Sequence, residues 1–301
     1  MISTFTLKYS NSKLLFFIVN FFKLFTKCIY CFKILLKGTL LNKGIDIKMQ
    51  ENELKRYEEI GNWDFSDIKY ITKQESEWDF YQIIKNITNP TSLLLDLGTG
   101  GGEKSLELLP DVGMIIGTDF SSKMIETANK NKLNYPNKRI KFVCMDNLNL
   151  AFPNSLFDVV CARHTIIDAK QIYNILSDNG YLIIEGVDKY DCWELKQLFG
   201  RGQAFKDEVS ISQIDLENIK NAGFKVEFEE ITQYEYYQTK DDLLALLLKT
   251  PILDDFSEIT PSNNVHKTYI EPELFDKYVE SHQTEDGIEL KRVLYGIVAQ
   301  K

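Results

Sequence analysis

The chain lacks the features that mark membrane-spanning, secreted and zinc-binding proteins. Its longest uncharged apolar run near the N-terminus, residues 14–22, has nine residues, whereas a helix that spans a bilayer needs about 20. The first alanine is Ala128, so the small-residue cleavage site of a secretory signal is missing. Five cysteines give no even disulfide framework, and Cys28 and Cys31 have no second cysteine pair or nearby histidine to complete a zinc site. The sequence therefore favours a cytoplasmic protein without a bound metal.

Acidic residues are almost absent from residues 1–48, which carry eight Lys and one Asp, a charge of +7. Residues 49–301 carry the remaining 27 basic and 43 acidic groups, a charge of −16. Because such a surface repels phosphate backbones, nucleic acid is disfavoured as a substrate.

The basic N-terminal extension, residues 1–48, allows two interpretations. On a helical wheel, the lysines within residues 8–37 gather on one side and Phe and Leu fill the rest, which is typical of a helix in a membrane interface. Peripheral membrane contact through residues 8–37 would follow. Alternatively, the extension has the composition of translated upstream sequence, and Met49 is the true start.

The most informative stretch is an apolar run, residues 93–95, that ends in Asp96 and is followed by closely spaced glycines. Residues 96–102 include Asp96, Gly98, Thr99, Gly100 and Gly102. A buried strand that enters such a turn lets backbone N–H groups approach a ligand closely. The third glycine of a dinucleotide fingerprint is missing, because its position is Glu103. A carboxylate before the glycines suits a ligand that carries ammonium and sulfonium groups.

Two further predicted strands also end in acids. The apolar residues 113–118 precede Asp119, which lies 21 residues after Gly98; a Rossmann-like unit places a ribose-binding acid at about that interval. The alternative is that Asp119 only caps the next helix. Residues 140–144 precede Asp146, which can accept a hydrogen bond from an adenine amine. Because ligands bind at the carboxyl ends of parallel strands, these acids predict one shared site.

Alternating strands and helices over residues 49–301 predict a single α/β domain. We expect a Rossmann-like, doubly wound, seven-stranded and mostly parallel sheet with helices on both faces. Strands are expected at 93–96, 113–118, 140–144, 157–161, 181–184, 224–231 and 292–299, and helices at 51–60, 75–87, 121–131, 168–176, 191–199, 212–221 and 243–248. The connection before the last strand, about 238–288, is too long for a turn and predicts a substrate-covering lid, with surface decoration as the alternative.

These motifs resemble those of class I S-adenosylmethionine-dependent methyltransferases, closely over about residues 90–190. Within that superfamily the chain is most similar to the quinone-biosynthesis and methyltransferase type 11-like group. The resemblance implies S-adenosyl-L-methionine as the cofactor and an antiparallel last strand. The implied cofactor-binding residues are Asp96, Gly98, Thr99, Gly100, Gly102, Asp119, Phe120, Met145, Asp146 and Asn147.

Candidates for the chemistry follow the fourth predicted strand. His164 is one of three histidines, and its ordinary pKa near 6.5 suits a general base. Arg163 could hold an acidic substrate group, and Glu185 and Arg201 are further candidates for the substrate side. For His164 and Arg163, purely structural hydrogen bonding is the alternative.

The sequence thus predicts methyl transfer from S-adenosyl-L-methionine to a small-molecule acceptor that it does not identify. An RNA methyltransferase is an alternative that the −16 charge of residues 49–301 disfavours. A nicotinamide-dependent oxidoreductase is another, and the missing third glycine and Asp96 argue against it. A third alternative is a protein that binds the cofactor without transferring the methyl group.

Overall fold

The computed structural model of the protein describes residues 67–254 and 269–301. These residues belong to one compact unit, residues 52–301. The N-terminal extension, the predicted helix at 51–60 and residues 255–268 of the predicted lid lie outside the described residues. Among the helices that are described, none is both long and apolar enough to cross a membrane.

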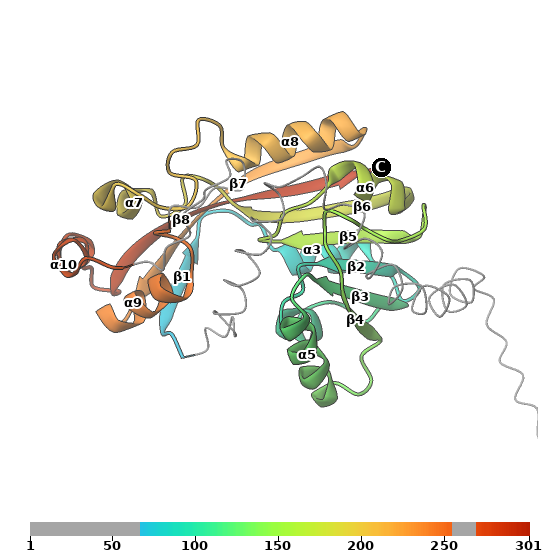
Figure 1. The fold of residues 1–301 in the computed structure, drawn as a ribbon, viewed down its shortest axis with the longest axis horizontal. Helices are drawn as coiled ribbons and strands as arrows, with labels where there is room; N and C mark the ends of the chain where they lie inside the picture. Colours follow the sequence, from blue (N-terminus) through green and yellow to red (C-terminus); the bar gives the residue numbers. More distant parts are fainter. Residues whose placement is uncertain (1–66, 255–268) are drawn as a thin grey trace, which may run out of the picture. The chain divides into compact units, whose positions relative to one another are not determined.

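The described strands form one eight-stranded sheet in the order β1-β7-β8-β6-β5-β2-β3-β4 (Figure 1). Their bounds are β1 (Tyr70–Gln74), β2 (Leu93–Leu97), β3 (Met114–Asp119), β4 (Ile140–Cys144), β5 (Phe157–Arg163), β6 (Leu176–Val187), β7 (Lys225–Tyr237) and β8 (Ile288–Gln300). Strands β2 to β6 pair in parallel, and β8 is antiparallel to both of its neighbours. The Rossmann-like α/β fold and the antiparallel last strand are confirmed.

The strand count differs from the expected seven because β1 is added at one edge, antiparallel to β7. All five residues of β1 are exposed. Its sequence lacks the alternation of apolar and polar residues that predicts a half-buried strand. Strands β7 and β8 are also longer than expected, at 13 residues each. Residues 177–180 form an irregular part of β6, where the register with β5 shifts and Asn179 has a φ of 62°.

The helices have the bounds α3 (Phe80–Ile87), α4 (Glu103–Glu107), α5 (Ser122–Asn131), α6 (Ala169–Ile175), α7 (Trp193–Phe199), α8 (Ile211–Ala222), α9 (Lys240–Lys249) and α10 (Pro272–His282). Several begin after a side chain that accepts a hydrogen bond from the first turn, namely Asp79, Ser121, Asp168, Ser210 and Thr239. The cap at Asp79 explains why α3 begins later than predicted. Helix α10 was not predicted.

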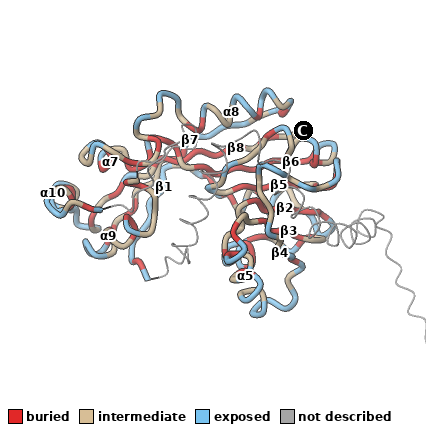
Figure 2. Tube along the Cα trace, in the orientation of Figure 1, coloured by how far each residue is buried: buried red, intermediate tan, exposed pale blue. Residues whose placement is uncertain are grey.

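Helices cover both faces of the sheet, as predicted. Helices α6 and α8 lie along one side and α5 along the other (Figure 1). Strand β2 is buried along its whole length, and the central strands are the most deeply buried part of the sheet (Figure 2). Burial on both faces explains the unbroken apolar run at residues 93–95.

A second apolar core joins α7, α9 and α10 to the parts of β7 and β8 beside the connection between them. It includes Leu195, Leu243, Leu247, Phe275, Tyr278, Tyr237, Ile288 and Leu290. The described parts of the predicted lid are therefore packed against the extended strands. This packing explains why β7 and β8 are longer than the strands predicted at 224–231 and 292–299.

A buried ionic network lies close to this core. The Arg292 guanidinium donates to both oxygens of Asp191 at 2.8 and 3.1 Å and to both oxygens of Glu235 at 3.1 and 3.2 Å. Burial disfavours the charged guanidinium, but the two carboxylates hold the pKa of Arg292 well above its ordinary value. The hydroxyl of Tyr237 also donates to Glu235. The network thereby ties β7 and β8 to the turn after β6.

We predict that Arg292→Met lowers the free energy of unfolding by about 3–5 kcal/mol, because the Asp191 and Glu235 carboxylates stay buried without their cation. Urea denaturation measures the loss. The exposed neighbour Lys291 provides the control, since Lys291→Met should change the stability by less than about 0.5 kcal/mol. Equal effects of the two substitutions would contradict a stabilising role for the network.

Candidate functional site

The candidate site lies at the carboxyl ends of four neighbouring parallel strands. The sheet order places β5, β2, β3 and β4 side by side. Asp96 lies in β2, Asp119 ends β3, and Asp146 follows β4 by two residues. The structure therefore brings the three acids that the sequence singled out to the same edge of the sheet.

The Asp119 carboxylate contacts the glycine turn directly. Its Oδ2 accepts a hydrogen bond of 3.0 Å from the amide of Gly100, and its Oδ1 accepts one of 2.9 Å from the amide of Ser121. Burial raises the pKa of Asp119, and these two backbone donors oppose that rise. The bond from Ser121, the N-cap residue of α5, shows that Asp119 supports the start of that helix, and its role toward a ligand remains a prediction.

The glycines of the turn serve different purposes. Gly100 has a φ of +58°, and a Cβ built on it would have no other atom within 4 Å, so the space beside it is open. A Cβ on Gly98 would lie 2.8 Å from the Cβ of Thr165. On Gly102 it would lie 2.6 Å from the ring of Phe142. Only Gly100 leaves room for a ligand, whereas the other two glycines make room for neighbouring side chains.

The Asp96 side chain is directed into the protein. Its Oδ2 accepts from the Ser105 hydroxyl, and its Oδ1 accepts from the Cys161 thiol at 3.6 Å. The Thr99 hydroxyl lies 2.8 Å from that of Ser105. Burial raises the pKa of Asp96, and the bond from Ser105 opposes the rise. In this arrangement Asp96 holds the glycine turn to the start of α4.

Asn147 bridges two strand ends that the sequence did not connect. Its Nδ2 donates to the Thr165 hydroxyl at 3.0 Å, and its Oδ1 accepts from the Thr118 hydroxyl at 3.2 Å. Neither threonine was predicted as a site residue, although Thr165 directly follows His164. The neighbouring Asp146 accepts from the amide of Leu148 at 2.9 Å, which shapes the loop after β4.

Phe120 and Met145 hold the ends of β3 and β4 together. The carbonyl of Phe120 accepts from the thiol of Cys144 at 3.3 Å, and the amide of Met145 donates to the carbonyl of Asp119 at 2.9 Å. The predicted cofactor residues after these strands therefore form a connected edge. Their assignment to particular parts of a ligand remains a prediction.

On the other side of Gly98, the structure brings together Arg163, His164 and Glu185. The Nε of Arg163 donates to Glu185 Oε1 at 2.6 Å, and the Nε2 of His164 lies 3.6 Å from the same oxygen. Partial desolvation of the ring, then the nearby cations Arg163 and Arg292, lower the pKa of His164. The imidazole is therefore neutral near physiological pH, and its side chain remains 35% exposed.

Two aromatic residues that the sequence did not assign to the site border this group. The indole of Trp78 donates to Glu185 Oε2 at 2.9 Å. Tyr81, on α3, lies near Arg163 and Asp96, and burial raises the pKa of its hydroxyl. Trp78 was not predicted as a site residue, because a sequence does not reveal which polar partner an indole finds.

Arg201 makes its hydrogen bonds to the lid. Its Nη2 donates to the carbonyl of Tyr269 and, at 2.9 Å, to the carboxylate of Glu271, just before α10. These contacts join the loop after α7 to the segment before α10, and a substrate role for Arg201 stays a prediction.

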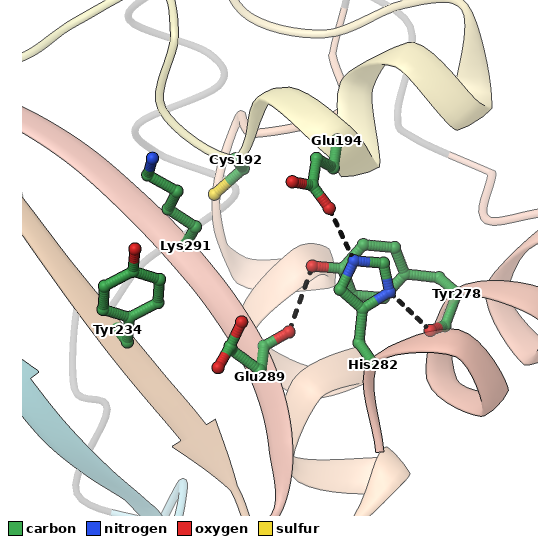
Figure 3. Close-up of a pocket in the computed structure, with 7 residues that line it drawn as sticks. All are labelled: Cys192, Glu194, Tyr234, Tyr278, His282, Glu289 and Lys291. Atoms are coloured by element: carbon green, nitrogen blue, oxygen red, sulfur yellow. Dashed lines mark hydrogen bonds and ion pairs between the residues drawn. The ribbon is translucent and has the colours of Figure 1, made fainter. Parts of the chain in front are cut away.

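A polar pocket of about 190 Å³ lies where the lid meets β7 and β8 (Figure 3). Its lining residues are Cys192, Glu194, Tyr234, Tyr278, His282, Glu289 and Lys291. His282, at the end of α10, lies 2.8 Å from Glu194 of α7 through its Nε2 and stacks on the ring of Tyr278 at 3.9 Å. No predicted cofactor or catalytic residue lines this pocket, and its polar contacts connect α10 to α7.

In a comparison with known families, residues 94–180 match the model of a methyltransferase domain. The chain is also similar to the 2-phytyl-1,4-naphtoquinone methyltransferase of Nostoc punctiforme, with 27% identity over 126 residues. That alignment covers 40% of this chain and 52% of the relative, so the chain spans about half the length of the curated relative that it matches.

Two solved structures share the fold. The YcgJ protein of Bacillus subtilis has a TM-score of 0.50 at 15% identity, with coverage of 74% of this chain and 97% of that protein. A functionally unknown protein of Deinococcus radiodurans has a TM-score of 0.51 at 12% identity, with coverage of 83% and 98%. At these identities the likeness extends to the fold alone.

We predict that Asp96→Asn stabilises the protein at neutral pH. Because the folded-state pKa of Asp96 is raised above its ordinary 3.8, ionisation of this carboxyl costs folding free energy as the pH rises through that raised pKa. The amide avoids this cost, by about 1.4 kcal/mol for each unit of the rise. The gain should be full above the raised pKa and disappear toward pH 4.

Urea denaturation between pH 8 and pH 4 measures this difference. Asp178→Asn is the control, since Asp178 is an exposed carboxyl at the opposite end of the sheet and its substitution should have little effect at any pH. A stability difference for Asp96→Asn that is constant with pH would rule out the raised pKa.

Proposed function

We propose that this chain is a class I methyltransferase that transfers a methyl group from S-adenosyl-L-methionine to a small-molecule acceptor. The match of residues 94–180 to a methyltransferase domain and the fold support this proposal. The observation that carries the proposal is the contact between the Asp119 carboxylate and the amide of Gly100, beside open space at a glycine turn. A carboxylate so placed can accept from the two hydroxyls of a ribose.

Residues at the same edge of the sheet would provide the remaining cofactor contacts. Phe120, Met145, Asp146 and Asn147, at the ends of β3 and β4, would border the adenine. Asp96, with Thr99 and Gly98, would support the turn beside the amino-acid portion, and the open side of Gly100 fits a ligand that approaches the backbone closely. When bound, S-adenosyl-L-methionine supplies an electrophilic methyl group on a sulfonium.

The chain's own contribution is alignment and removal of a proton. His164 follows β5 at the edge where the cofactor would lie, and its imidazole is neutral and partly exposed. A neutral imidazole can accept a proton from an acceptor atom that attacks the methyl carbon. The fixed positions of Arg163 and Glu185 would hold this part of the site in one geometry.

A small molecule is the acceptor class that the observations favour. The name of the Nostoc relative describes methylation of a naphthoquinone, and the net charge of −16 over residues 49–301 opposes binding of nucleic acid. We propose that residues 238–288, which include the packed helices α9 and α10, form the lid that covers such an acceptor.

We predict that Asp119→Ala abolishes measurable binding of S-adenosyl-L-methionine by isothermal titration calorimetry. Loss of two hydrogen bonds to a charged acceptor corresponds to at least about 100-fold in affinity. The control is Asp178→Ala, which should bind as the native protein does. Circular dichroism checks that both variants fold, and unchanged affinity of folded Asp119→Ala would remove this assignment.

The same variant tests the reaction. Native protein should transfer a labelled methyl group from S-adenosyl-L-methionine into the metabolite or lipid fraction of a cell extract, and Asp119→Ala should not. Label that appears only in RNA would refute the small-molecule acceptor. Cofactor binding without transfer to any fraction would indicate a non-catalytic binder.

We further propose a cytoplasmic protein that contacts membranes peripherally through residues 8–37, as the separation of lysines from Phe and Leu supports. The full chain should co-sediment with vesicles rich in anionic lipid, and more weakly at high salt. A chain that begins at Met49 is the matched control and should stay in the supernatant. Equal behaviour of the two chains would refute the membrane contact.

A further inference from the structure

Three nitrogen atoms surround the carboxylate of Glu185, which is only 8% exposed. Arg163 Nε is 2.6 Å from Oε1, and Trp78 Nε1 is 2.9 Å from Oε2. His164 Nε2 is 3.6 Å from Oε1, which is beyond the usual length of about 2.7–3.2 Å for an N–H···O bond. The carboxylate is therefore bonded on each oxygen by a residue other than the histidine.

We propose that Arg163 is a positioning residue for His164. By holding the near oxygen of Glu185, it keeps the imidazole from a hydrogen bond with that carboxylate and leaves it free to accept the proton of the methyl acceptor. This inference rests on the proposed methyl transfer. It gives Arg163 a role other than binding an acidic substrate group.

The backbone places the side chains of Arg163 and His164 beside the same carboxylate, that of Glu185. Arg163 and Glu185 are direct partners on the parallel strands β5 and β6. His164 has a φ of 53°, and its amide donates to the carbonyl of Glu185 at 2.8 Å. Both side chains are thus held beside one carboxylate, and the arginine has the shorter contact.

Trp78 donates a hydrogen bond to Glu185, and this bond would break if the Glu185 carboxylate turned toward His164. The indole lies on Gly296 of β8, where an added Cβ would come within 2.5 Å of the ring. The glycine therefore makes the indole position possible, and the Nε1–Oε2 bond fixes the second oxygen of Glu185. Rotation of the carboxylate would break this bond as well as the bond from Arg163.

The charges around His164 favour a neutral ring. Arg163 on β5 and Arg292 on β8 are the cations that act on it, and Glu185 on β6 is the carboxylate beside it. Arg292 is itself bonded to Asp191 and Glu235. With Glu185 taken by Arg163, the imidazole lacks the anion that would stabilise its protonated form.

The neutral ring matters for the chemistry. During transfer, a lone pair of the acceptor atom forms a bond to the methyl carbon, and the carbon–sulfur bond breaks with its electron pair left on sulfur. The proton of the acceptor atom passes to His164, and the resulting imidazolium releases it to solvent. An imidazole already protonated in a pair with Glu185 could not take that proton.

The proposal can be tested without knowledge of the acceptor, because the chain has only three histidines. The pKa of His164 is measured by NMR titration of the free full-length protein, with the resonance assigned by its loss in His164→Gln. We expect Arg163→Met to raise this pKa by at least one unit, about tenfold in proton affinity, because the freed Glu185 can pair with the imidazolium.

A double variant separates the carboxylate from the direct effect of the arginine's charge. Arg163→Met with Glu185→Gln should bring the pKa of His164 back down, since no carboxylate then remains to pair with the ring. A rise that persists in the double variant would overturn the proposal, because Arg163 would then act through its own charge alone. An unchanged pKa in Arg163→Met would also overturn it.

Two further measurements keep the outcome interpretable. If circular dichroism shows that Arg163→Met is unfolded, the shorter, uncharged amide of Arg163→Gln replaces it in both variants, with the same expected rise and reversal. Calorimetry with S-adenosyl-L-methionine is run on the native protein in parallel. Absence of cofactor binding there would refute the proposed function, whereas the histidine titration would still decide the role of Arg163.

Discussion

The parallel pairing of β2 with β3 is the constraint on which the candidate site depends. Their register sets Asp96 opposite Gly117 and carries Asp119 to the amide of Gly100 across the turn. Pairing of β3 with β4 and of β2 with β5 brings the remaining polar residues to the same edge. Because β2 is buried on both faces, this register has little freedom to slip.

Buried charge in this protein is held in small groups with several hydrogen bonds. Asp96 accepts from Ser105 and Cys161, Glu185 accepts from Arg163 and Trp78, and Arg292 lies between two carboxylates. Such groups stabilise a fold only when every member keeps its partner. His164 lies beside one of these groups. The carboxylate next to it, that of Glu185, is already bonded to Arg163.

The described parts of the segment predicted as a lid, residues 238–288, are packed into the fold. The apolar residues of this segment extend the core along β7 and β8, while the pairs His282–Glu194 and Arg201–Glu271 join it to α7 and the loop that follows. Arg292, on β8, connects both regions, because it bonds to the network beside the lid and also acts electrostatically on His164.

The sequence by itself determined the parallel core, the glycine turn and the acids at the strand ends, because each is a local pattern of apolar, glycine and acidic residues. It did not reveal β1, whose residues are all exposed, or the use of the space at Gly98 by Thr165. Only the tertiary structure decided the partners of the buried charges, since Trp78 and Glu185 are 107 residues apart and Arg292 and Asp191 are 101 apart. Contacts over such separations depend on how the whole sheet assembles and leave no local pattern in the chain.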